Sequence, residues 1–186
     1  MFFVGVAAPG GEESDKNARL DKALRKLAKG HTEAMEELYE LTKTAVYGYI
    51  FSILKNAQDA EDILQDTYVK VCMNADQYTA RGKPMAWILT IARNLSLMRI
   101  RSQKRMTDIP DYEWEAIADG NGNFGTEDRM VLQAALTQLS EEESRIVMLH
   151  AVSGLKHREI ADMMDMPLAT VLSKYNRAIK KLQKYI

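Results

Sequence analysis

The sequence contains a single cysteine, three histidines and no long apolar run. With Cys72 as the one cysteine among 186 residues, no internal disulfide framework exists and a reducing compartment is indicated. No stretch approaches the roughly 20 apolar residues of a membrane-spanning helix, which argues against a transmembrane protein. The apolar start of the chain is too short for a signal peptide and follows no positive charge, so residues 1–17 are interpreted as a disordered leader. We expect a cytoplasmic protein with no direct membrane insertion.

Motifs of catalysis and of cofactor binding are also missing. The histidines His31, His150 and His157 are dispersed, without the paired spacing of a zinc site. The sequence has no phosphate loop, nucleotide fingerprint or nucleophile motif. We interpret Cys72 as a small buried hydrophobe and not as a nucleophile. The sequence therefore predicts neither an enzyme nor a cofactor.

The last part of the chain is patterned as a helix-turn-helix. Apolar residues recur at helical spacing until Gly154 interrupts them: Leu139, Ile146, Val147 and Leu149. A short helix over about 157–164 follows, and Asp165-Met166-Pro167 ends it, because proline fits the first turn of a new helix better than a helix interior. A third helix is predicted from Leu168. Two short helices joined by a tight turn favour DNA as the partner.

This third helix separates apolar from basic positions. Its predicted buried stripe consists of Val171, Tyr175, Ala178 and Leu182. More exposed positions carry Thr170, Lys174, Arg177 and Lys181. Residues 166–186 contain five Lys or Arg and no acid, a composition that suits contact with phosphates in a major groove. A solvated basic helix end in an ordinary bundle is the alternative interpretation.

The net charge of −1 conceals a segregation of charge along the chain. Residues 77–107 carry seven Lys or Arg and no acid, whereas residues 107–128 carry seven Asp or Glu and no Lys or Arg. Like charges keep a segment extended, and the DGNGNFG run favours turns. We interpret 107–128 as a flexible acidic linker, although a solubilising spacer would look the same. Lying on a basic patch, the linker would draw the two domains together at low salt.

The predicted fold class is all-α, with two small helical domains over 18–106 and 129–186. Helical spacing predicts a helix over 15–30 with Leu20, Ala23, Leu24 and Leu27 inward. A long helix runs from about 33 to 54, and the next places Ile63, Leu64, Thr67, Tyr68 and Val71 inward. The exposed face of that helix is acidic. The last helix begins at Pro84, with a core stripe of Trp87, Ile88, Ile91, Leu95 and Met98.

Three motifs occur in a fixed order. DAEDILQDTYVKV at 59–71 is followed by KPMAWILTIARNLSLMRIR at 83–101 and by GLKHREIADMMDMPLATVLSKYNRAIKKL at 154–182. In order and spacing they resemble a bacterial RNA polymerase sigma factor of the extracytoplasmic-function (ECF) group of the sigma-70 family. The resemblance covers roughly residues 18–106 and 130–186, which would be sigma region 2 and sigma region 4.

The resemblance implies roles for individual residues. The acidic helix of such factors docks on core RNA polymerase, at the clamp helices of its largest subunit. The residues of this chain that match the docking helix are Asp62, Gln65 and Asp66. The flap of the polymerase is a further expected contact. The segment around 78–94 opens the minus-ten promoter element, and the implied DNA contacts are Tyr78, Arg81, Lys83, Arg93, Asn94, Arg99 and Arg101. The recognition helix reads the minus-thirty-five element through Thr170, Lys174, Arg177 and Lys181. We favour Trp87 as a core anchor over a base-stacking residue.

Two departures from the family pattern affect the helix-turn-helix. Asp165 stands where many relatives have glycine, which is tolerable because Asp enters the left-handed region more readily than most residues. Lys174 replaces a frequent arginine, so a bidentate guanine contact is lost there. The predicted function is a sigma factor that binds promoter DNA and core RNA polymerase and has an anti-sigma partner. The alternative is an autonomous helix-turn-helix regulator with a helical sensor or dimerisation domain.

Overall fold

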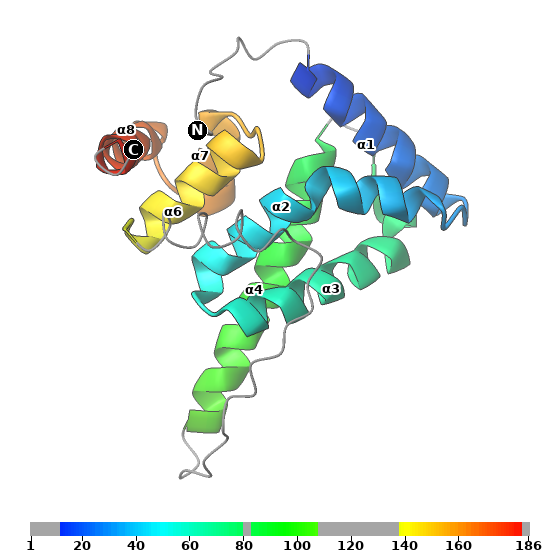
Figure 1. Ribbon diagram of the computed structural model, residues 1–186, viewed down its shortest axis with the longest axis horizontal. Coiled ribbons are helices and arrows are strands. Elements are labelled where there is room, and N and C mark those ends of the chain that lie inside the picture. The colour runs from blue at the N-terminus through cyan, green and yellow to red at the C-terminus, as the bar shows by residue number, and fades with distance from the viewer. Residues whose placement is uncertain (1–11, 80–82, 108–137, 184–186) are drawn as a thin grey trace.

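The computed structural model describes residues 12–79, 83–107 and 138–183, in which every regular element is helical (Figure 1). The first group of helices comprises α1 (Glu12–Ala28), α2 (Ala34–Leu54), α3 (Ala57–Met73), the 3-10 turn η1 (Ala75–Gln77) and α4 (Pro84–Thr107). The second comprises α6 (Glu141–Val147), the π-helical turn η2 (Met148–Val152), α7 (His157–Met164) and α8 (Leu168–Leu182). The all-α prediction is confirmed, while the predicted linker beyond Thr107 lies outside the described residues.

Helix α1 begins earlier than the sequence pattern indicated. Residues 12–17, part of the predicted disordered leader, are helical. Between Gly11 and Gly30 the chain contains neither glycine nor proline, so nothing in its composition interrupts the helix. The predicted stripe of Leu20, Ala23, Leu24 and Leu27 is buried. Gly30, at φ 85°, takes a left-handed conformation that suits glycine after a helix end.

Helix α2 is the centre of the molecule. Every residue from Ala45 to Ile53 is buried, as expected of a helix covered on all sides. Helices α1, α3 and α4 pack against it, and α6 and η2 of the second group contact it as well. Buried side chains of both groups, such as Ile50 and Leu149, belong to one apolar cluster. The helix-turn-helix therefore shares its core with the first group.

The turns between helices rely on a few local conformations. Lys55 ends α2 in a left-handed conformation at φ 56°, and the side chain of Asn56 caps α3 by accepting the Asp59 N–H at 2.9 Å. Asp165, at φ 53°, ends α7 in the left-handed region, as predicted. In η2 the Ser153 N–H donates to the Met148 carbonyl at 2.9 Å, five residues back, which makes the turn wider than an α-helical one.

Two predicted buried side chains are exposed. Met98 is 61% exposed, because the buried face of α4 runs through Ile88, Leu89 and Ala92 and the helix turns Met98 away from it. Cys72 is also exposed, since it lies one residue beyond the buried Val71 and therefore about 100° around the helix. Desolvation raises the pKa of the Cys72 thiol, which disfavours the nucleophilic thiolate form.

The register of α4 is open to a direct stability test. We expect Ile88→Ala to destabilise the protein by about 2–5 kcal/mol, because the fully buried side chain leaves a cavity. Met98→Ala on the same helix is the matched control, with an expected change within about 0.5 kcal/mol because its side chain is exposed. Urea unfolding followed by circular dichroism measures both. Equal losses would contradict this register of α4.

Candidate nucleic-acid interface

Helix α4 carries an exposed face with polar and basic side chains. Thr90, Asn94, Met98 and Arg101 are exposed and follow one another at intervals of three or four residues, which places them on one side of the helix. The structure thus brings together two of the predicted DNA contacts, Asn94 and Arg101. The last turns of α4 extend beyond the other helices, so this face is open to solvent (Figure 1).

Tyr78 holds the segment that precedes α4 against the bundle. Its hydroxyl donates to the carboxylate of Asp21 on α1, and its ring lies 5.3 Å from that of Trp87, centroid to centroid. Burial and the bond to Asp21 both raise the pKa of Tyr78. Trp87 packs against the apolar cluster, as predicted for a core anchor. Arg81, another predicted contact, lies outside the described residues.

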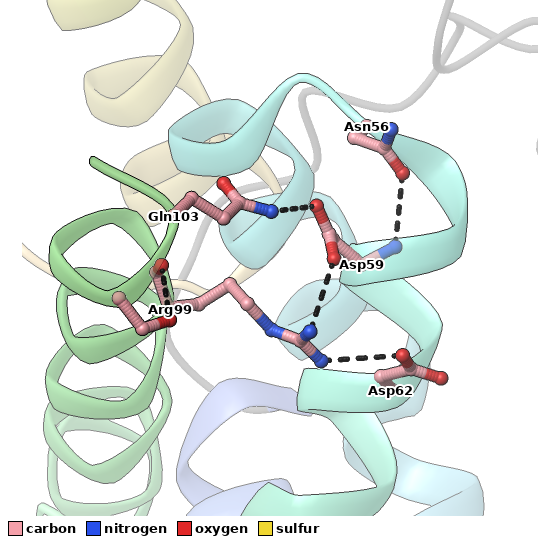
Figure 2. A network of polar contacts seen from close by, with 6 residues as sticks. Asn56, Asp59, Asp62, Arg99 and Gln103 are labelled. Carbon is pink, nitrogen blue, oxygen red and sulfur yellow. Dashed lines mark hydrogen bonds and ion pairs between the residues drawn. The ribbon is translucent and has the colours of Figure 1, made fainter. Parts of the chain in front are cut away.

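Arg99 is engaged by carboxylates of α3 instead of standing free for phosphates. Its guanidinium lies 3.4 Å from Asp59 Oδ1 and 3.2 Å from Asp62 Oδ2 (Figure 2). Gln103 donates to the other oxygen of Asp59 at 2.7 Å, so two consecutive turns of α4 bond to the start of α3. A residue predicted to bind DNA is thereby paired with Asp62, which was predicted to bind polymerase. Arg93 is half-buried elsewhere on α4.

The outer face of α3 is acidic at its beginning and apolar at its end. The predicted residues Asp62, Gln65 and Asp66 are all exposed. Val69 and Met73 continue the same face and are 56% and 67% exposed. Large exposed apolar side chains in a row are typical of a protein contact. Neither residue is among the predicted contacts, although Val69 follows Gln65 by four residues and Met73 follows Val69 by four, which is the spacing of one helix face.

Two of the predicted contacts on α8 are paired with acids of α6. Lys174 Nζ lies 2.5 Å from Glu142 Oε2, and Lys181 Nζ lies 2.7 Å from Glu143 Oε2. Glu143 is buried and also accepts the Ser140 N–H, which closes the capping box at the start of α6. Burial alone would raise the pKa of Glu143, but the bonds from Lys181 and Ser140 outweigh it and lower that pKa.

The fully exposed face of α8 carries a different set of side chains. Its polar members are Ser173, Asn176, Arg177 and Lys180, spaced by three, one and three residues, and the apolar Ala169 and Leu172 are exposed beside them. Of the four predicted contacts, Arg177 alone belongs to this set, and Thr170 is half-buried. Among the ion pairs of the described residues none involves Arg177. The predicted buried stripe next to it holds, with Val171 and Ala178 buried.

The helix-turn-helix is also tied to the first group by polar contacts. Lys83 Nζ lies 2.8 Å from Glu159 Oε1 of α7, and this pair raises the pKa of Lys83. Lys55 donates to Ser144 at 3.2 Å. The sequence favours close packing of the two domains through the acidic linker, whereas the contacts of the described residues include apolar side chains, the Lys83–Glu159 ion pair and the Lys55–Ser144 hydrogen bond. Any part played by the acidic linker lies outside the described residues.

Other kinds of site find no support in the described residues. Across 12–79, 83–107 and 138–183 no three His, Cys, Asp or Glu side chains gather as metal ligands would. Nor does any helix of these ranges combine the length and apolar composition required to cross a bilayer. The side chains that gather on exposed faces are instead basic or amide groups on α4 and α8, and acidic and apolar groups on α3.

The Lys83–Glu159 ion pair links the first group of helices to the helix-turn-helix, so its loss should change the salt concentration at which the two separate. Glu159→Gln removes the charge facing Lys83 and keeps an oxygen for the Lys156 N–H. We expect the radius of gyration to increase at a lower salt concentration than in the wild type, by a small margin because exposed ion pairs contribute little. Small-angle scattering across a salt series measures it. Glu40→Gln, which breaks an ion pair within α2, is the control and is expected to match the wild type.

Two family models match the chain. The model described as Sigma-70 region 2 matches residues 38–106, and the model described as Sigma-70, region 4 matches residues 129–182. The ECF RNA polymerase sigma factor SigK of Mycobacterium ulcerans (strain Agy99) is 28% identical over 187 residues, covering 96% of this chain and 97% of the relative. The ECF RNA polymerase sigma factor SigW of Bacillus subtilis (strain 168) is 24% identical over 185 residues, covering 90% and 96%.

Two solved structures are similar to this chain. The chain is similar to the sigma factor RpoE in its complex with the anti-sigma factor NepR from Bartonella quintana, with 25% identity and a TM-score of 0.61 over 80% of this chain and 94% of that one. It is also similar to CnrH in complex with the cytosolic domain of CnrY, with a TM-score of 0.58 over 90% of this chain and 96% of that one. At 19% identity, this second likeness concerns the fold.

Proposed function

The chain belongs to the sigma-70 family, in its extracytoplasmic-function group, and on that premise we propose that it binds core RNA polymerase and directs transcription from promoters of its own specificity. One observation carries the proposal. A single chain presents an acidic and apolar face on α3 and, apart from it, basic and amide faces on α4 and α8. A protein partner fits the first face, and DNA fits the other two.

The polymerase contact is assigned to the outer face of α3. Asp62, Gln65 and Asp66 supply charge and hydrogen-bonding groups, which complement a basic partner helix such as the clamp helices of the largest subunit. Val69 and Met73 supply apolar area at the end of the same face. Arg99 lies 3.2 Å from Asp62 Oδ2, so a polymerase cation that bonds to this oxygen competes with Arg99 for it.

Opening of the minus-ten element is assigned to α4 and the segment before it. An unpaired base needs a pocket, hydrogen-bonding groups and nearby cations. Asn94 offers an amide donor and acceptor, and Arg101 on the same face suits a phosphate. Tyr78, Arg81, Lys83, Arg93 and Arg99 remain candidates. Of these, Lys83 and Arg99 have carboxylate partners that phosphates would have to replace.

Reading of the minus-thirty-five element is assigned to the exposed face of α8. Arg177 and Asn176 have the side chains that pair bidentately with guanine and adenine in a major groove. Ser173 and Lys180 flank them and suit phosphates or base edges. Lys174 and Lys181 are held by Glu142 and Glu143, so we place them in a supporting role at the edge of the contact.

The remaining parts of the proposal concern partners and place. We propose that an anti-sigma factor regulates the chain, which the complex of the similar RpoE with NepR supports. We place the protein in the cytoplasm, where core polymerase and promoters are found. Catalysis belongs to the polymerase in this proposal, and the chain contributes binding energy alone. The domain limits of 18–106 and 129–186 are proposed on the same basis.

Run-off transcription on a pooled promoter library, with purified core polymerase, tests the function. We expect specific transcripts when the protein is present and none without it. Asp66→Lys reverses a charge on the α3 face and is expected to abolish both polymerase association and transcripts while leaving the fold intact, since exposed helical charges rarely decide stability. Glu36→Lys, an exposed acid of α2, is the matched control. Duplex binding by the protein alone, without transcripts, would indicate an autonomous regulator instead.

The assignment on α8 predicts unequal effects of two substitutions. Arg177→Ala is expected to weaken promoter binding by the holoenzyme by about 1–3 kcal/mol and to reduce the salt slope by about 1 if it contacts a phosphate. Lys174→Ala is expected to cost less, because the Lys174 ammonium is already paired with Glu142. Filter binding across a salt series compares them. The reverse order would show that Lys174 leaves Glu142 for DNA.

A further inference from the structure

Three aromatic rings meet where the helices of the helix-turn-helix join. They belong to His150 of η2, His157 at the start of α7 and Tyr175 of α8. The two imidazole centroids are 3.9 Å apart with an interplanar angle of 37°. The Tyr175 ring stands edge-on to both, at 4.8 Å from His150 and 4.9 Å from His157. Each of the three elements thus contributes one ring to a single contact, which we name the ring junction.

The hydrogen bonds of the ring junction define its protonation. His150 Nδ1 lies 2.8 Å from the Leu155 carbonyl oxygen, which accepts, so this nitrogen carries the proton. His157 Nε2 is buried and has no hydrogen-bond partner within the described part of the chain. The imidazolium form carries a proton on both ring nitrogens, so a charged His157 would hold an Nε2 proton without an acceptor in the described residues, and a buried charge without a partner is costly.

The charges around the ring junction do not compensate an added proton. Burial and the neighbouring His150 both lower the pKa of His157. His157 is the first residue of α7, where the helix dipole also disfavours a cation. Glu159 on the same helix is bonded to the Lys156 N–H and to Lys83. On α8 the phenol of Tyr175 has a pKa raised by burial, and the adjacent Lys174 is paired with Glu142 of α6.

We propose that the ring junction is an acid-sensitive lock: the stacked rings hold α8 in place, and protonation of His157 releases it. The charged His157 ring must leave its buried position to reach water, and the contacts that it gives up are those that fix α8 against η2 and α7. Acidification therefore loosens the helix that presents Arg177. The inference concerns the stability of the helix-turn-helix and does not rest on the proposed function.

The sign of the pH dependence follows from the lowered pKa. The unfolded chain binds a proton at His157 near pH 6.5, whereas the folded chain does so at lower pH. Stability from the ring junction is therefore complete above the unfolded pKa and is lost as the pH falls through the window between the two values. An exposed histidine with the same pKa in both states would contribute no such dependence.

The first test uses the intact wild-type protein and NMR titration of its three imidazoles. The His157 imidazole of the urea-unfolded protein serves as the reference. We expect the midpoint of His157 to lie at lower pH in the folded protein than in the unfolded protein. The protection factors of the α8 amide protons, corrected for the intrinsic exchange rate at each pH, are expected to fall through the same transition. Coincident midpoints, or α8 amides whose protection does not follow the titration, would overturn the proposal.

The second test compares variants by thermal unfolding from about pH 7.5 to about pH 5.5, the range in which histidines change charge. His157→Phe keeps an aromatic ring and cannot take up a proton. It is expected to lose less Tm on acidification than the wild type, whereas His31→Gln is expected to follow the wild type. Equal losses in all three proteins would overturn the proposal. If His157→Phe does not fold, the titration of the wild type still decides.

Discussion

The complete burial of the carboxyl-terminal half of α2 is the constraint on which the rest of the structure depends. Residues 45–53 are too apolar to face water on any side, so the first group of helices alone does not satisfy them. The helix-turn-helix covers what remains and thereby gains a fixed position beside α2. Each surrounding helix packs its apolar side toward the core around α2, so the opposite faces of α3, α4 and α8 remain exposed.

A second constraint is that the chain carries its own counter-charges. Several of the predicted DNA-binding cations are paired with carboxylates of neighbouring helices. Examples are Lys83 with Glu159 and Lys181 with Glu143. Nucleic acid must displace these partners or bind elsewhere, so the number of cations overstates the positive charge available to DNA. This distinction separates the paired residues from Arg101 and Arg177, which are exposed.

The sequence predicted correctly those features that depend on the pattern within one helix. Helical spacing located the buried stripes of α1, α3 and α8, and the glycine and proline positions located the turns around Gly154 and Pro167. Features that depend on two helices were not predicted. The exposure of Met98 depends on how α4 packs against its neighbours, and the ion pair of Lys174 depends on the position of Glu142 on α6. The ring junction left no local signal, because His150, His157 and Tyr175 lie on three different elements and meet only through the turns between them.

The π-helical turn η2 makes the orientation of the helices that follow it depend on the number of residues in the turn. Its bond from Ser153 to Met148 spans one residue more than an α-helical bond, so the turn accommodates one additional residue. Without that residue the chain would continue as an ordinary helix, and everything after it would be rotated by about 100° about the axis of α6. The direction in which α8 faces therefore depends on the one additional residue that this turn accommodates.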